Sequence, residues 1–224
     1  MLRGFRPGRR FRAARAWSNQ VLRQIAPLMG GAVLNVSGWR DEDKQGGHYR
    51  DYFTNAGSYS VSNYGGGFRG ELSDHDLALD LEADLPPEFH GLADVVFNHT
   101  TLEHVFDVFK AVRNLCSLTR DIVIVVVPAI QEEHPSPDFD DYWRFMSGSL
   151  RKLFESNGLT PVLLVSSPYR DCAVYHFLVA ARHPESWRDV MPKINGSVND
   201  GKDFFRESLV ERIACRLRGL ANNK

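Results

Sequence analysis

The longest apolar run of the chain is Ile122-Val123-Ile124-Val125-Val126-Val127, which ends at Pro128. Every residue in it is β-branched, and such side chains favour extended strands because they pack well on a pleated surface. A strand that is apolar at consecutive positions is buried on both faces, as in a parallel sheet covered by helices. The run is far shorter than the ~20 apolar residues that cross a bilayer. We therefore expect residues 121–127 to form the central strand of an α/β domain.

Outward from this strand, short apolar runs alternate with segments of helical spacing. Further strands are expected at 32–36, 59–62, 76–81, 94–98, 161–165 and 173–180. Helical spacing is clear over 101–118 and 149–157, a short helix is expected near 49–53, and Gly158 is well placed to end the helix before it. No long helix separates the last two strands, which predicts an antiparallel edge hairpin. The pattern predicts a doubly wound, mostly parallel, seven-stranded sheet of the Rossmann-like α/β class.

Composition limits the class of protein. The 224 residues are 43% hydrophobic and 25% charged, which suits one globular domain. The formal net charge of −1 gives no overall electrostatic reason for binding nucleic acid. The cysteines Cys116, Cys172 and Cys215 are too far apart for a disulfide framework or a zinc motif. Reduced thiols in a cytoplasmic protein are therefore expected.

Positive charge gathers at the N-terminus, where seven arginines lie within residues 1–30 and the first acidic residue is Asp41. We expect residues 1–30 to form a basic helix that packs on the domain and exposes its arginines. Two alternative interpretations of this segment are an organellar transit peptide and a helix that contacts a membrane surface through Trp17 and Leu22. The main domain is expected over residues 31–185. Residues 186–224 are expected to be a linker and an amphipathic C-terminal helix.

Three motifs and one histidine suggest a family. The motifs are Asp80-Leu81-Glu82-Ala83-Asp84-Leu85-Pro86, Leu102-Glu103-His104-Val105 and Asp141-Tyr142-Trp143-Arg144-Phe145, with His134 before the third. Over about residues 31–182 the chain resembles class I S-adenosylmethionine-dependent methyltransferases, in particular type 11-like enzymes associated with polysaccharide biosynthesis. The resemblance implies S-adenosylmethionine as cofactor. It also implies methyl transfer to a hydroxyl or carboxyl group of a small-molecule or glycan-type substrate.

The resemblance places the cofactor at the carboxyl ends of the first four strands. The implied cofactor-binding residues are Asn35, Ser37, Gly38, Asn63, Asp80, Leu81, Asn98 and His99. The family usually has an acid at the positions of Asn35 and Asn63 and several glycines around Gly38. The loss of both acids would weaken cofactor binding by several kcal/mol, at about 1.5–3 kcal/mol for each charged hydrogen bond. Compensation by residues 41–43 is one reading, and an inactive binding or scaffold protein of the same fold is the alternative.

The candidate catalytic residues are His104 and His134, because an imidazole can accept a proton near neutral pH. His104 could instead bond to a helix start, and Glu103 could form a capping box with Thr100. Tyr142 and Arg144 are predicted to bind substrate by stacking and by a guanidinium fork, and Trp143 is expected to be a packing anchor. The polar loop with His134, Asp138, Asp140 and Asp141 lacks a recurring ligand spacing, so no metal site is predicted.

Overall fold

The computed structural model describes residues 8–66, 70–168 and 173–194. The predicted C-terminal helix and the linker at 195–201 lie outside the described residues. The sheet has seven strands in the order β3-β2-β1-β4-β5-β7-β6. Their bounds are β1 Gly31–Val36, β2 Ala56–Asn63, β3 Leu77–Ala78, β4 Ala93–His99, β5 Thr119–Ile130, β6 Thr160–Ser166 and β7 Val174–Ala181.

The strand β5 lies between β4 and β7, as the apolar run predicts. Residues Ile122 to Val127 are fully buried, because both faces of the strand are covered. The pairing of β4 with β5 is parallel, whereas β7 runs antiparallel to both β5 and β6. The predicted mostly parallel sheet with an antiparallel edge hairpin is therefore confirmed.

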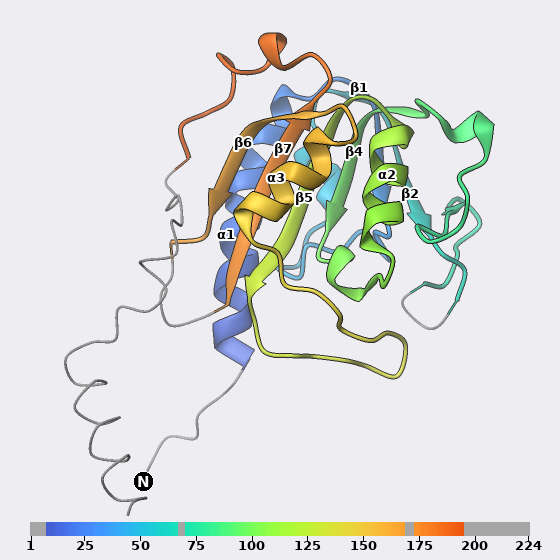
Figure 1. The fold of residues 1–224 in the computed structure, drawn as a ribbon, viewed down its shortest axis with the longest axis vertical. Helices are drawn as coiled ribbons and strands as arrows, with labels where there is room; N and C mark the ends of the chain where they lie inside the picture. The colour runs from blue at the N-terminus through green and yellow to red at the C-terminus, as the bar shows by residue number, and fades with distance from the viewer. Residues whose placement is uncertain (1–7, 67–69, 169–172, 195–224) are drawn as a thin grey trace, which may run out of the picture.

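Within the described residues, three α-helices cover the sheet from two sides (Figure 1). The helix α1 (Gly8–Ile25) packs on one face, and α2 (Val108–Leu118) and α3 (Ser147–Glu155) pack on the other. Each face has its own apolar core, so β4 and β5 bury side chains on both sides. The remaining helical turns are short 3-10 helices: η1 Ala26–Leu28, η2 Tyr49–Tyr52, η3 Pro87–Phe89, η4 Leu102–His104 and η5 Pro184–Ser186.

The expected alternation of strand and helix is wrong in the first half of the chain. Only η2 lies between β1 and β2, only η3 lies between β3 and β4, and the described residues between β2 and β3 contain no helix. The segment after β1 cannot be helical because Ser37, Trp39, Asp41 and Lys44 all have positive φ. The strand predicted at 76–81 is reduced to Leu77–Ala78. The α/β fold therefore keeps its sheet while loops replace several of its helices.

The helix expected over 101–118 is divided in two. The segment begins with η4, and α2 starts only at Val108. Asp107 caps α2, since its side chain accepts a hydrogen bond of 3.0 Å from the amide of Lys110. The capping box of Thr100 and Glu103 is wrong: no side chain caps η4, and Thr100 has a φ of +50°. The side chain of Glu103 therefore does not cap a helix.

The N-terminal helix packs on the domain as expected, with Trp17, Val21, Leu22 and Ile25 buried. While it is packed in this way, that apolar face is not available to a membrane. The arginines differ from the expectation, because Arg12 is exposed but Arg15 is partly buried against the sheet. No helix in the described ranges is long and apolar enough to cross a bilayer.

The acid sensitivity of the fold is predicted to depend on His176 in β7, which is 1% exposed and lies 2.8 Å from the Ser166 hydroxyl. Burial lowers the pKa of His176 to about 4, against a smaller opposing effect of the Phe145 backbone. The folded state favours the neutral ring of His176. The contribution of this ring to the stability of the fold is therefore complete above pH 6.5 and is lost as the pH falls towards 4. The free energy of unfolding should drop by about 3 kcal/mol over that range.

Urea denaturation at pH 7 and at pH 4.5 tests this expectation. The variant His176→Gln should lose less stability between the two pH values than the wild type, and the exposed His183→Gln should behave as the wild type does. Some loss remains in His176→Gln, because burial also lowers the pKa of His99. Equal losses in the wild type and His176→Gln would contradict the assignment.

Candidate functional site

A cavity of about 440 Å³ opens at the carboxyl ends of the parallel strands. It lies where the strand order reverses between β1 and β4, which is the usual ligand position in doubly wound sheets. Its walls come from α1, from the segments that follow the first four strands, and from the loop between β5 and α3. The predicted site residues that line it are Asn35, Ser37, Gly38, Asn63, Asp80, Leu81, His99, His104 and Tyr142.

Three predicted site residues are not part of the cavity wall. The Asn98 side chain is fully buried and donates a hydrogen bond of 2.9 Å to the Val36 carbonyl, so it ties β4 to β1. His134 lies behind His104, and Arg144 is bonded to the loop that carries it. Asn98 and Arg144 therefore hold the walls in place rather than face the cavity.

The segment after β1, residues 37–48, is held by the buried carboxylate of Asp41, which we call the Asp41 anchor. The carboxylate accepts hydrogen bonds from the Asn35 amide at 2.8 Å, the Tyr59 hydroxyl at 2.6 Å and the Arg50 backbone amide at 3.0 Å. Asn35 is thus a partner of Asp41, which explains an amide at this position. A side chain on Gly38 would lie 2.5 Å from the Asn35 amide nitrogen, so the retained glycine also serves this packing.

The second replaced acid, Asn63, holds the same segment from β2. Its side-chain oxygen accepts a hydrogen bond of 2.9 Å from the Trp39 amide, and its nitrogen donates to the Trp39 carbonyl at 3.2 Å. The nitrogen also donates to Asp76 at 3.0 Å. A carboxylate could not make the two donations, because it only accepts hydrogen bonds. Asparagine at position 63 is therefore explained by the loop that it clamps.

The three acids considered as replacements are separated by the structure. Asp41 and Asp43 are each 2% exposed and are bonded to other protein groups, the latter to the Tyr52 hydroxyl at 2.6 Å. Glu42 alone among them lines the cavity, where it forms an ion pair of 3.3 Å with Lys44. Of these three acids, only Glu42 is placed to contact a ligand in the cavity.

Sequence reasoning missed Arg15, which reaches the cavity from α1. Its guanidinium contacts the Tyr49 hydroxyl at 3.2 Å, His99 Nδ1 at 3.2 Å and the Thr100 hydroxyl at 2.7 Å. Burial, and then the charge of Arg15, lower the pKa of His99 well below 6.5, so all three partners are neutral at pH 7. No carboxylate of the described residues forms an ion pair with Arg15. The helical register was the missed signal, because position 15 shares a stripe with buried Ser18 and Leu22.

A partly buried cation that has only neutral partners favours an anion in the space beside it. The cavity wall at Arg15 is therefore suited to a carboxylate or phosphate group of a ligand.

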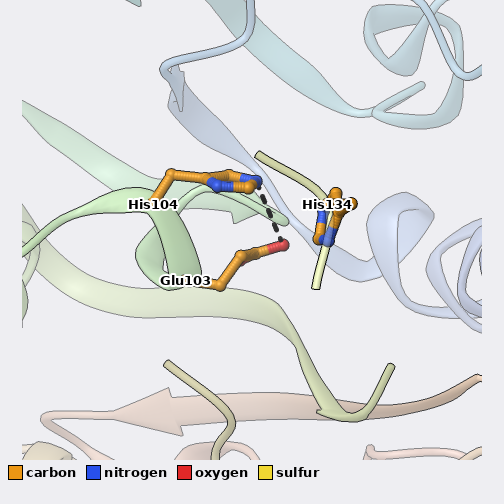
Figure 2. Close-up of side chains that lie close together, drawn as sticks. All are labelled: Glu103, His104 and His134. Atoms are coloured by element: carbon orange, nitrogen blue, oxygen red, sulfur yellow. Dashed lines mark ion pairs between the residues drawn. The ribbon is translucent and has the colours of Figure 1, made fainter. Parts of the chain in front are cut away.

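Next to the cavity, Glu103, His104 and His134 lie together, and we call them the Glu-His-His cluster (Figure 2). Glu103 and His104 come from η4, and His134 comes from the loop between β5 and α3. The Glu103 Oε1 atom is 3.9 Å from His104 Nε2, and the two imidazole ring centres are 5.0 Å apart. The two candidate histidines are thus brought together, although 30 residues separate them in sequence.

Glu103 has an unusual environment for an acid. It is 0% exposed, and neither carboxylate oxygen accepts a hydrogen bond from another described residue. Burial raises the pKa of Glu103 to about 8, against the opposing effect of its own backbone amide. The group is therefore mostly protonated at pH 7, unless a positive charge binds next to it.

Arg144 has a different role from the substrate contact that the motif predicts. Its guanidinium donates to the two carboxylate oxygens of Asp141 at 2.6 and 2.7 Å and to the backbone oxygens of Gln131 and Glu132. Although burial opposes it, Arg144 and then the backbone amide of His134 lower the pKa of Asp141 to about 2. Trp143 is an anchor, as expected, and its indole donates to the Val105 carbonyl at 3.0 Å.

The Asp41 anchor is expected to be required for stability. Asp41→Ala removes a buried acceptor and leaves the Asn35 amide and the Tyr59 hydroxyl without their partner, which should lower the free energy of unfolding by about 3 kcal/mol. Urea denaturation of this variant measures the loss. Asp51→Ala, at an exposed position of η2, is the matched control and should change stability by less than about 0.5 kcal/mol. Equal stability of the two variants would show that the anchor is unimportant.

Comparison with known proteins gives structural matches only. No protein-family profile matches the chain, and no curated protein matches it. A complex of the Haloferax volcanii Trm112 methyltransferase activator and a putative methyltransferase matches with a TM-score of 0.56 at 14% identity, over 76% of this chain and 90% of that chain. Magnesium protoporphyrin IX methyltransferase of Synechocystis PCC 6803, with bound S-adenosylhomocysteine, matches with a TM-score of 0.51 at 13% identity, over 76% and 86%.

A third structure is the 1,6-didemethyltoxoflavin-N1-methyltransferase of Burkholderia thailandensis, with its substrate and S-adenosylhomocysteine bound. It matches with a TM-score of 0.50 at 14% identity, over 81% of this chain and 92% of that chain. At such low sequence identity the matches show the fold alone. The chain has the fold of the class I S-adenosylmethionine-dependent methyltransferases.

Proposed function

We propose that the chain is an S-adenosylmethionine-dependent methyltransferase that acts on a hydroxyl or carboxyl group of a small-molecule or glycan-type acceptor. The observation that carries the proposal is Arg15, a cation at the cavity wall whose contacts are all neutral. The amino-acid end of the cofactor carries a carboxylate, which is the anion that Arg15 lacks. The position of the cavity at the switch point of the fold supports the same ligand.

The residues present fit this cofactor in part. Arg15 would hold the carboxylate at one end of the cavity. Asp80 and Leu81, which follow β3 at the other end, would hold the adenine. Asn63 is occupied by Trp39, so the ribose hydroxyls would rely on Glu42 instead. An ion pair of Glu42 with Lys44 must loosen for that contact, which is consistent with weaker binding than in enzymes with an acid at the end of β2.

The bound cofactor would supply an activated methyl group, so the chain's own residues have to orient the acceptor and remove its proton. His104 lines the cavity, and burial lowers its pKa, against the opposing Asp140 carbonyl. It is therefore neutral at pH 7 and able to accept a proton. Tyr142, also at the cavity and 45% exposed, offers a ring on which a sugar or another flat acceptor can stack.

The role of Arg15 is tested with two ligands. S-adenosylhomocysteine has the amino-acid end, whereas 5′-methylthioadenosine shares its adenosine and sulfur but lacks that end. Arg15→Met should weaken S-adenosylhomocysteine about 10- to 100-fold, because a charged hydrogen bond contributes about 1.5–3 kcal/mol. It should leave 5′-methylthioadenosine unchanged. Isothermal titration calorimetry measures both affinities.

Arg12→Met is the matched control for Arg15→Met, since Arg12 is an exposed arginine on the same helix. It should leave both affinities at the wild-type value. An equal effect of Arg15→Met on the two ligands would place the carboxylate elsewhere.

Asp80 should act on the other end of the cofactor. Asp80→Asn is expected to weaken S-adenosylhomocysteine and 5′-methylthioadenosine by similar factors of about 10, because both ligands carry the adenine. The same titrations measure this. Unchanged affinities would remove Asp80 from the cofactor site.

A second function is favoured by Asn63. With this amide bonded to Trp39, an inactive binding or scaffold protein would keep the fold and leave the cavity without a cofactor. For such an inactive protein we expect no heat of binding in calorimetry and no shift of the melting temperature with millimolar S-adenosylhomocysteine. Clear binding by the wild-type chain would argue against it.

A further inference from the structure

The Glu-His-His cluster has a property that methyl transfer does not explain. Its acid, Glu103, is 0% exposed, accepts no hydrogen bond from another described residue, and directs its carboxylate towards the two imidazoles (Figure 2). A buried acid without a partner is unfavourable, whether it is ionised or holds its proton without an acceptor for it. Each of the three side chains can offer one ligand atom such that all three atoms lie within 4.8 Å of one another.

The outer ring nitrogens of both histidines are already engaged. The Nδ1 atom of His104 is 2.7 Å from the Asp140 carbonyl oxygen, and this oxygen can only accept a proton. The Nδ1 atom of His134 is 2.8 Å from the carboxylate of Asp141, whose side chain is fully buried. Hydrogen bonds at Nδ1 assign the protons to these nitrogens, so the Nε2 atom of each ring carries an electron pair. At His134 the Gln131 amide nitrogen lies 3.4 Å from Nε2, and this weak contact has to give way when an ion binds. This arrangement, with an oxygen behind each imidazole, is typical of metal-binding histidines.

Further contacts hold the outer partners in position. Arg144 bonds to both oxygens of Asp141, so the carboxylate behind His134 is fixed and ionised. The Glu103 carbonyl accepts hydrogen bonds from the amides of Tyr142 and Trp143 at 2.7 and 3.2 Å, which docks the loop after β5 onto η4. The two segments that carry the cluster are therefore joined before any ion binds.

We propose that Glu103, His104 and His134 bind one divalent transition-metal ion of the Zn²⁺ class. Two imidazoles and one carboxylate are the ligand set of catalytic zinc sites and of non-haem iron sites. Ligands of a tetrahedral ion bound at about 2.0–2.1 Å lie about 3.3 Å apart. The 3.9 Å between Glu103 Oε1 and His104 Nε2 is close to that value, and the three ligand atoms lie within 4.8 Å of one another, so the side chains have to draw closer around the ion.

The ion would leave at least one coordination position open, because three protein ligands do not fill a tetrahedral site. Of the three ligands, His104 lines the cavity, and so the open position is on the cavity side. A bound hydroxyl or carboxyl group would be polarised there, with the ion rather than the imidazole of His104 contacting the acceptor. This use of the ion rests on the proposed function, whereas binding of the ion does not.

Metal binding is tested on the full chain without cofactor. The protein is freed of metal with a chelator, the chelator is removed, and Zn²⁺ is titrated calorimetrically at pH 7.5. We expect one tight site for Zn²⁺ and none for Mg²⁺, which prefers oxygen ligands. His134→Ala and Glu103→Gln should each weaken Zn²⁺ binding by more than about 100-fold, since each removes one of three ligands. The exposed His183→Ala, outside the cluster, should bind Zn²⁺ as the wild type does.

Two measurements keep the result decisive. Glu103→Gln preserves the volume of the side chain and removes a buried acid, so its fold, checked by circular dichroism and thermal melting, should be intact. Absorption spectra of the Co²⁺-loaded chain should show nitrogen and oxygen ligands without a thiolate charge-transfer band. Unchanged Zn²⁺ affinity in folded Glu103→Gln and His134→Ala, a thiolate band, or no Zn²⁺ binding by the wild type would each overturn the proposal.

Discussion

The carboxylate of Asp41 is the constraint on which the cavity depends. It collects the Asn35 amide, the Tyr59 hydroxyl and the Arg50 amide, and so fixes a segment in which four non-glycine residues have positive φ. In most doubly wound folds a helix would follow β1 and present its N-terminal amides to the ligand. Here hydrogen bonds among side chains hold the wall instead. Asn63 completes the same arrangement by clamping the backbone of Trp39.

Because the buried acids of the segment after β1 are bonded to neighbouring protein groups, charge for a ligand comes mainly from other elements. Arg15 reaches the cavity from α1 and has neutral hydrogen-bond partners, whereas the buried carboxylate of Glu103, close enough to interact electrostatically with Arg15, accepts no hydrogen bond from another described residue. A charged group that lacks a hydrogen-bonded counter-ion is unfavourable in a partly desolvated site. We propose a carboxylate as the ligand of Arg15 and a metal ion as the ligand of Glu103.

The sheet could be predicted from the sequence because its signals are local. Ile122–Val127 is apolar at every position, and the last two strands have no room for a helix between them, so β5 and the β6–β7 hairpin follow. Most of the cofactor-binding residues that the family resemblance implies also line the cavity. The segment after β1 could not be predicted in this way, because its shape comes from Asp41 and Asn63 bonding to partners up to 24 residues away.

The site residues that sequence reasoning misplaced have a common cause. Arg144 looked available for a substrate, but Asp141, three positions earlier, holds it. Arg15 looked like one of many surface arginines until the packing of α1 turned it towards His99. The sequence predicts Glu103 in a capping box, whereas in the structure Asp107 caps the helix. In each case several partners were open to the residue type, and the folded structure selects one of them.

We propose that the cavity holds S-adenosylmethionine with its carboxylate on Arg15. A crystal structure of the chain with S-adenosylhomocysteine tests this most directly. We expect ligand density in the cavity between β1 and β4, with the carboxylate within hydrogen-bond distance of the Arg15 guanidinium and the adenine beside Asp80. Ligand density elsewhere, or a carboxylate that points away from Arg15, would contradict it.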